Sequence, residues 1–154
     1  MKFEKYHGLG NDFLITEDLS IVGNSELIKS VCNRYTGIGS DGLIIVKKEP
    51  LEMVFYNQDG TRGEMCGNGI RCFSYYCYNH HFINGNSFDC NTLDGVKHLE
   101  IKSTNPFVVK VKMGQFTNQQ KTALANPEAR SATSTAISNA LKESFTLPFL
   151  TGNS

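Results

Sequence analysis

The stretch from Glu64 to Tyr78, EMCGNGIRCFSYYCY, decides how this chain folds. Its two glycines mark a break between a loop and a helix, because glycine interrupts regular elements and permits close backbone contacts. Beyond the glycines, apolar residues recur at helical spacing and also fill the remaining faces. They are Ile70, Cys72, Phe73, Tyr75, Tyr76, Cys77 and Tyr78. A helix that is apolar nearly all round is expected to be central and buried.

Short apolar runs separated by glycine-rich turns flank this helix on both sides. They predict strands over residues 3–7, 12–16, 43–46, 52–56, 87–91, 96–102 and 107–113. A further helix is predicted from an N-cap at Ser25 to about Tyr35. Many strands with few helices favour the α+β class over a parallel α/β sheet.

The composition of the chain changes after Phe116. Residues 1–116 carry the strand and helix pattern, and we expect them to form one domain. Residues 117–140 are dominated by Ala, Ser, Thr, Asn and Gln, a composition typical of a surface helix, a linker or a disordered segment. Residues 145–150 are apolar again, so we interpret 117–154 as a separate inter-domain or truncated region with an apolar end.

The charge balance and the length of the apolar runs argue against two classes of partner, nucleic acids and membranes. The 154 residues include 15 Lys and Arg and 15 Asp and Glu, whereas a nucleic-acid-binding protein would normally show a basic excess. No apolar run approaches the roughly twenty residues of a membrane span. The N-terminus also lacks the apolar core of a secretory signal. We therefore expect a cytoplasmic protein whose partners include neither nucleic acid nor a membrane.

The odd number of cysteines favours reduced thiols over disulfides in such a protein. The five are Cys32, Cys66, Cys72, Cys77 and Cys90. Cys72 and Cys77 lie near His80 and His81, but the spacing fits no common zinc module, and no metal site is predicted. Most of these thiols are expected to be small buried hydrophobic side chains.

Cys66 is the candidate for chemistry because it stands at the predicted start of the central helix. Unpaired backbone amides and the positive end of the helix dipole favour a thiolate there. A thiolate suits either a nucleophile or a general base, and the alternative is a structural cysteine. A nucleophile usually needs a histidine beside it, and His7, next to a glycine turn, is a candidate, although a hydrogen-bonded histidine at a strand end is the more common role.

Three asparagines lie in or beside glycine turns and could bind a ligand. Asn11, Asn57 and Asn68 together could present amide donors and acceptors to a small zwitterion, although each alone is also a common turn former. The backbone amides of Gly67 and its neighbours offer a seat for a carboxylate at the helix start.

Four ordered motifs resemble the signatures of diaminopimelate epimerases. They are HGLGNDF at 7–13, GIGSDGL at 37–43, FYNQDG at 55–60 with EMCGNGIRCF at 64–73, and VKVKMG at 109–114. The resemblance implies a mixed or antiparallel sheet wrapped around a central helix, which is one half of a two-domain fold. It also implies a cofactor-independent amino-acid epimerase that interconverts LL- and meso-2,6-diaminopimelate for lysine and peptidoglycan synthesis.

The same resemblance implies roles for particular residues. In the family, two cysteines face each other across the α-carbon, and one removes its proton while the other delivers a proton from the far side. Carried over by position, Cys66 is one of these catalytic cysteines. Asn11, Asn57, Gly67 and Asn68 match substrate-binding positions.

The chain also departs from the family pattern. Family members are longer and fold as two similar halves, the second of which brings the other cysteine. Cys72 lies on the same predicted helix as Cys66 and cannot face it across a substrate. We therefore expect an N-terminal half with little or no activity alone, whose uncovered apolar face could drive formation of a homodimer. At Gly42, where some members carry a substrate-binding glutamine, that contact is in doubt.

Two alternatives remain open at this stage. One is a non-catalytic amino-acid-binding module of the same fold, and the other is a related cofactor-independent isomerase with another substrate. Asn68 argues against a proline racemase, because those enzymes usually place histidine there.

Overall fold

The computed structural model describes residues 1–112, 144–147 and 152–153. Its strands form one sheet in the order β10-β1-β2-β3-β4-β6-β7-β8-β9, with β5 paired to β4. The strands are β1 (Glu4–Gly8), β2 (Asn11–Thr16), β3 (Gly42–Lys48), β4 (Leu51–Asn57), β5 (Arg62–Gly63), β6 (Ser87–Thr92), β7 (Gly95–Thr104), β8 (Phe107–Lys112), β9 (Ser144–Leu147) and β10 (Gly152–Asn153). The helices are α1 (Ser25–Cys32), α2 (Gly67–Asn79) and the short 3-10 helix η1 (Leu19–Ile21).

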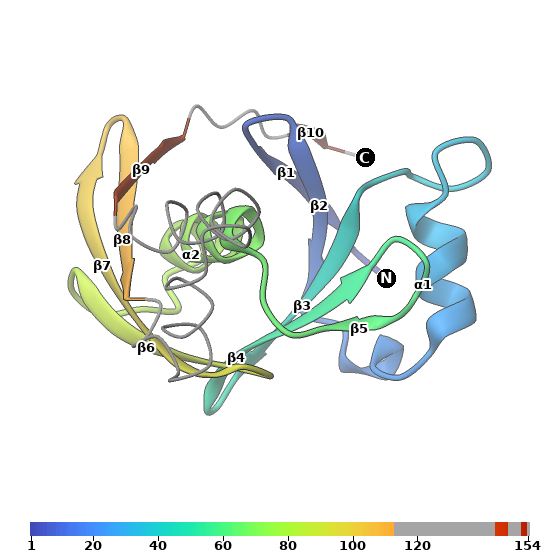
Figure 1. Cartoon of the computed structure of the whole chain (residues 1–154), viewed down its shortest axis with the longest axis horizontal. Coiled ribbons are helices and arrows are strands. Elements are labelled where there is room, and N and C mark those ends of the chain that lie inside the picture. Colours follow the sequence, from blue (N-terminus) through green and yellow to red (C-terminus); the bar gives the residue numbers. More distant parts are fainter. Residues whose placement is uncertain (113–143, 148–151, 154) are drawn as a thin grey trace, which may run out of the picture.

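The sheet is mixed and curls around α2, as Figure 1 shows, while α1 lies on its outer side. The pairs β2·β3 and β4·β6 are parallel, and the remaining neighbours are antiparallel. The expected α+β class with a sheet wrapped around a central helix is therefore confirmed.

The main hydrophobic core lies between α2 and the concave face of the sheet. From α2 it receives Ile70, Cys72, Phe73, Tyr76 and Cys77, all of which are buried. Tyr78, near the end of the helix, is not buried as predicted: 38% of its surface area is exposed. The central, buried position predicted for this helix is correct.

A second core lies on the outer face, under α1. Strand residues alternate between the two cores, since successive side chains point to opposite faces of a sheet. Thus Leu14 and Leu43 pack on the α1 side with Ile28, whereas Ile15 and Ile44 face α2.

The predicted bounds of α1 are wrong at both ends. The N-cap is Asn24, whose Oδ1 accepts a hydrogen bond from the Leu27 amide at 3.1 Å, and Ser25 is the first helical residue. The helix ends at Cys32, because Asn33 turns the backbone to an extended conformation and its side chain accepts from the Tyr35 amide at 2.8 Å. Asn competes with the helical backbone through such local hydrogen bonds.

Four of the five cysteines are fully buried, as expected for structural thiols, and only Cys66 is partly exposed. Burial raises the pKa of Cys72 and of Cys90 to about 12. These thiols are therefore protonated at neutral pH and unavailable for chemistry.

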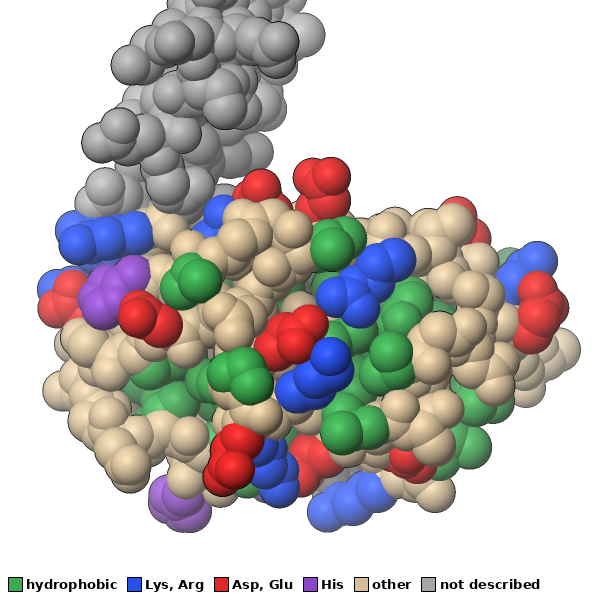
Figure 2. All heavy atoms as spheres, turned by 90° about the horizontal axis from the view of Figure 1, so that it is seen from below, with side chains coloured by type: hydrophobic (Ala, Val, Ile, Leu, Met, Phe, Trp, Pro, Cys, Tyr) green, Lys and Arg blue, Asp and Glu red, His purple; other side chains and the backbone are tan. Residues whose placement is uncertain are grey.

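The boundary at residue 116 and the polar segment 117–140 lie outside the described residues. The first part of the apolar stretch that follows falls in β9, which pairs with β8. In the described part of the chain, no helix is long and apolar enough to cross a membrane. Figure 2 shows acidic and basic side chains intermixed on one face of the molecule, in keeping with the balanced composition.

Candidate functional site

Three strand ends meet at one end of the sheet and form the floor of the site. Strand β2 begins at Asn11, β3 begins just after Asp41, and Gly42 pairs with both Phe13 and Asn57. Backbone hydrogen bonds close this edge: the Asp41 amide donates to the Asp12 carbonyl at 3.0 Å. Residues that are far apart in sequence are thereby brought to one place.

Cys66 lies at the N-terminus of α2, next to this edge. It is the N-cap residue, and its carbonyl accepts the first helical hydrogen bond from Ile70 at 2.8 Å. Its side chain makes no capping hydrogen bond, and Sγ instead donates to Oδ1 of Asn11 at 3.8 Å. A Cβ at Gly69 would lie 3.2 Å from the Cys66 Cβ, so a side chain there would push Cys66 away by a few tenths of an ångström.

Three of the predicted site residues are in mutual contact. Asn68 Nδ2 donates to the Asn11 Oδ1 that also accepts from the Cys66 thiol, at 3.3 Å. Gly67 begins the helix between Cys66 and Asn68, and a Cβ there would meet nothing within 4 Å. The structure therefore leaves open space beside the first amides of α2.

Two charged residues that the sequence analysis did not single out orient these asparagines. Asp41 Oδ2 accepts from Asn11 Nδ2 at 2.7 Å, and Arg71 Nη1 donates to Asn68 Oδ1 at 3.2 Å. Arg71 is buried, and burial lowers its pKa to about 10, so it remains a cation at neutral pH. A charged residue on an otherwise apolar helix, three positions after Asn68, was the signal that could have found it.

An ion cluster on the outer face anchors Asp41. Arg34 donates to Asp12 at 2.6 Å and to Asp41 at 2.8 Å, and Lys5 Nζ lies 3.2 Å from Asp12. Burial alone would raise the pKa of Asp12, but hydrogen bonds from Arg34, Lys5 and the Asp41 backbone hold it well below its usual range. The cluster therefore joins two strand ends and the loop after α1.

His7 does not serve as a partner of the Cys66 thiol. It pairs with Asp12 across β1 and β2, whereas Asn11 and Phe13 project from the other face of β2 toward α2. Because neighbouring strand residues alternate faces, His7 and Cys66 lie on opposite sides of the sheet. His7 therefore does not supply the Cys-His pair that the sequence left open.

Asn57 and Gly42 lie at the same edge of the sheet, but no hydrogen bond joins the Asn57 side chain to Cys66, Asn11 or Asn68. Asn57 is exposed, and its Nδ2 donates to Thr61 Oγ1 at 3.0 Å. A Cβ at Gly42 would lie 2.7 Å from the Tyr56 carbonyl and 2.8 Å from the Phe55 ring. A side chain at position 42, glutamine included, would therefore require the neighbouring backbone to shift.

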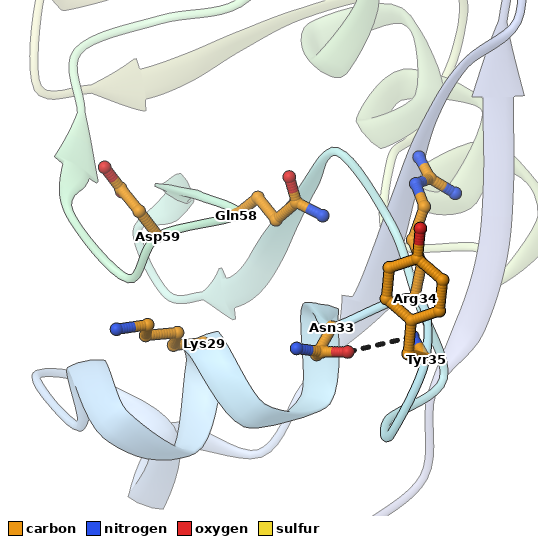
Figure 3. Close-up of a pocket in the computed structure, with 6 residues that line it drawn as sticks. All are labelled: Lys29, Asn33, Arg34, Tyr35, Gln58 and Asp59. Carbon is orange, nitrogen blue, oxygen red and sulfur yellow. Dashed lines mark hydrogen bonds between the residues drawn. The ribbon is translucent and has the colours of Figure 1, made fainter.

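A cavity of about 310 Å³ opens on the outer side, near the ion cluster. Figure 3 shows Lys29 and Asn33 on the α1 side of it, and Gln58 and Asp59 on the facing turn. Arg34 belongs both to this cavity and to the ion cluster, but Cys66 does not line it. Within the described residues, no three His, Cys, Asp or Glu side chains are arranged to hold a metal ion.

Comparison with known sequences gives one family. A profile of the family described as "Diaminopimelate epimerase" matches residues 3–118. The diaminopimelate epimerase of Clostridium perfringens is 43% identical over 122 residues, covering 74% of this chain and 45% of its own length. That of Alkaliphilus metalliredigens is 40% identical over 136 residues, covering 83% of this chain and 48% of its own length. The chain thus spans about half the length of the curated relatives it matches.

Solved structures share the fold at low sequence identity. A probable proline racemase from Agrobacterium radiobacter K84 gives a TM-score of 0.55 at 12% identity, over 73% of this chain and 41% of that one. A methylitaconate-delta-isomerase gives a TM-score of 0.53 at 11% identity, over 77% of this chain and 38% of that one. These likenesses establish the fold of this half and do not distinguish a substrate.

Proposed function

Because the chain belongs to the diaminopimelate epimerase family, we propose that it carries one side of the site of a cofactor-independent epimerase acting on LL- and meso-2,6-diaminopimelate. The observation that carries this proposal is the position of Cys66. It is the one partly exposed cysteine of five, at the N-terminus of α2 and in contact with Asn11.

The reaction requires an acid and a base on opposite faces of the α-carbon. A thiolate on one face takes the α-proton, so that an S–H bond forms as the Cα–H bond breaks. The electron pair is left on the α-carbon and its carboxylate. A thiol on the other face then returns a proton and inverts the centre. Cys66 acts as the acid in one direction of the reaction and as the base in the other.

The described site residues have the donors that such a carbanion needs. Open space lies beside the first turn of α2, where unpaired amides of Gly67 and Asn68 suit the substrate α-carboxylate. Asn11 and Asn68 line the same corner, and Asn57 stands at its rim to contact the remainder of the substrate. Fixed donors of this kind stabilise charge that develops in the transition state.

The chain supplies a single accessible thiol for this chemistry. The other four cysteines are buried, and burial raises the pKa of Cys77 as well as those of Cys72 and Cys90. A second reactive thiol must therefore come from a second half or from another copy of the chain. We infer that the chain alone binds the substrate without inverting it.

This function would place the protein in the cytoplasmic synthesis of lysine and of peptidoglycan precursors. The reaction as proposed needs no pyridoxal and no metal, because the thiol and the amides act directly on the substrate. Diaminopimelate is then the small-molecule partner, and a homodimer is one arrangement that would supply the second thiol.

Calorimetric titration of the chain with LL-diaminopimelate, proline and glutamate tests the substrate. Diaminopimelate is expected to bind most tightly, and Asn68→Ala is expected to weaken it by about tenfold through loss of one hydrogen bond. Asn86→Ala, at an exposed turn, is the matched control and should bind as wild type does. Tighter binding of proline or glutamate would favour an isomerase with another substrate, and no binding of any of the three would contradict the proposal.

A further inference from the structure

A directed chain of hydrogen bonds runs from Arg71 through two amides to Asp41. Arg71 donates to Asn68, Asn68 donates to Asn11, and Asn11 donates to Asp41, at 3.2, 3.3 and 2.7 Å. A guanidinium can only donate, and an ionised carboxylate can only accept. An isolated amide can flip, but these two charged ends permit a single orientation of each asparagine.

That orientation decides what faces the Cys66 thiol. Asn11 presents its oxygen, which accepts from Sγ at 3.8 Å. If the amide were reversed, an N–H group would face the sulfur instead. A carbonyl oxygen stabilises the protonated thiol, whereas an N–H donor stabilises the thiolate. The orientation of one amide therefore decides whether an acceptor or a donor faces the reactive sulfur.

We propose that Asp41 is a positioning residue for proton transfer, because it holds the Asn11 oxygen toward Cys66 and keeps this cysteine as the thiol in the resting protein. This inference rests on the proposed function and deepens it. Cys66 would begin a turnover as the proton donor, and the group on the other face of the substrate would begin it as the acceptor.

The carboxylate of Asp41 is well placed for this role. Its Oδ2 accepts from the Asp12 backbone amide at 3.1 Å as well as from Asn11, and its Oδ1 accepts from Arg34 at 2.8 Å. Arg71 is the cation coupled electrostatically to Cys66 along α2, and Cys72, which is coupled to it as well, is a neutral thiol at neutral pH. Substitutions at position 41 leave both of these groups in place.

Two neutral substitutions separate the hydrogen bond from the charge. Asp41→Ala removes both the charge and the acceptor, so the Asn11 amide is free to rotate. Asp41→Asn removes the charge but can keep an oxygen toward Asn11. The Asp12 backbone amide also donates to Asp41 Oδ2, and it stays in place in both variants. Arg34 loses its bond to Asp41 but keeps its bonds to Asp12.

The experiment measures alkylation of Cys66 by iodoacetamide, with peptide mapping, at neutral pH and at alkaline pH where accessible thiols are ionised. The rate at neutral pH divided by the rate at alkaline pH reports how much of the Cys66 thiol is ionised at neutral pH. Changes in the accessibility of the thiol affect both rates and cancel in this ratio. We expect Asp41→Ala to raise the ratio about fivefold and Asp41→Asn to stay within about twofold of wild type. An equal rise in both variants, which charge alone would give, or no rise in either, would overturn the proposal.

A second substitution keeps the proposal testable if Asp41→Ala does not fold, a failure that labelling of the four buried cysteines would reveal. Asn11→Ala removes the accepting oxygen itself and must raise the ratio as Asp41→Ala does; an unchanged ratio would overturn the proposal. Because labelling is measured without diaminopimelate, its result is independent of whether that amino acid binds. Failure of the positioning role is thus distinguishable from failure of the proposed function.

Discussion

Single glycines set the geometry around Cys66, and each does so for a different reason. Gly69 lets the thiol lie against the first turn of α2, Gly67 leaves space beside it, and Gly42 is enclosed by Phe55 and Tyr56. The first two keep the helix start beside Cys66 uncrowded. Gly42, in contrast, packs β3 tightly against β4 and cannot contribute a side chain to the site.

Gly42→Gln is therefore expected to destabilise the protein instead of restoring a substrate contact. Its Cβ would lie 2.7 Å from a backbone oxygen, and overpacking of this kind costs about 1–3 kcal/mol. Urea denaturation measures the free energy of unfolding. Gly67→Ala is the matched control, since a Cβ there meets nothing within 4 Å. Equal stability of Gly42→Gln and wild type would contradict this prediction, because it would mean that β3 and β4 move apart at Gly42 at no cost.

At the scale of elements, the site depends on how the loop after α1 is tied to the strand edge. This loop turns away at Asn33, and Arg34 then bridges Asp12 on β2 and Asp41 before β3. The carboxylate of Asp12 has its pKa held well below its usual range by Arg34 and Lys5, against the effect of burial. The position of Asp41, and through it that of Asn11, relies on this ionised cluster.

The stability that Asp12 contributes should depend on pH. Because its pKa is lower in the folded than in the unfolded protein, the contribution is complete above the unfolded value of about 4 and is lost as pH falls toward the folded value. Asp12→Asn is expected to cost about 2 kcal/mol at neutral pH and progressively less in acid. Urea denaturation across pH checks this, with exposed Glu49→Gln as control. A cost that is independent of pH would mean that the charge of Asp12 is unimportant.

Local patterns predicted much of the element structure, and tertiary contacts account for the remainder. The buried α2 and the strands before and after it follow from apolar spacing and glycine turns. The end of α1 was missed because the Asn33 side chain favours a turn over another helical residue. Cys66, Asn11 and Asn68 could be grouped from motifs, but the roles of Asp41 and Arg71 depend on hydrogen bonds between residues whose pairing only the folded chain reveals.

At the scale of the whole molecule, one sheet curled around one helix presents one accessible thiol. Inversion of an α-carbon needs two proton-transfer groups, and the described fold provides one of them, at the N-terminus of α2. The fraction of Cys66 that is ionised can still remove a proton and, once protonated, return one to the same face. Since an S–H proton exchanges with solvent, this would replace the α-hydrogen of a bound substrate without inverting the centre.

Cys66 is thus expected to exchange a proton with an α-carbon of diaminopimelate, and one measurement tests this directly. The meso isomer, which carries one α-carbon of each configuration, is incubated with the chain in heavy water, and deuterium at the α-carbons is followed by NMR for wild type and Cys66→Ser. Wild type is expected to incorporate deuterium with retained configuration, and Cys66→Ser is expected to lose this incorporation. Equal rates in the two proteins, whether high or at the protein-free level, would contradict it.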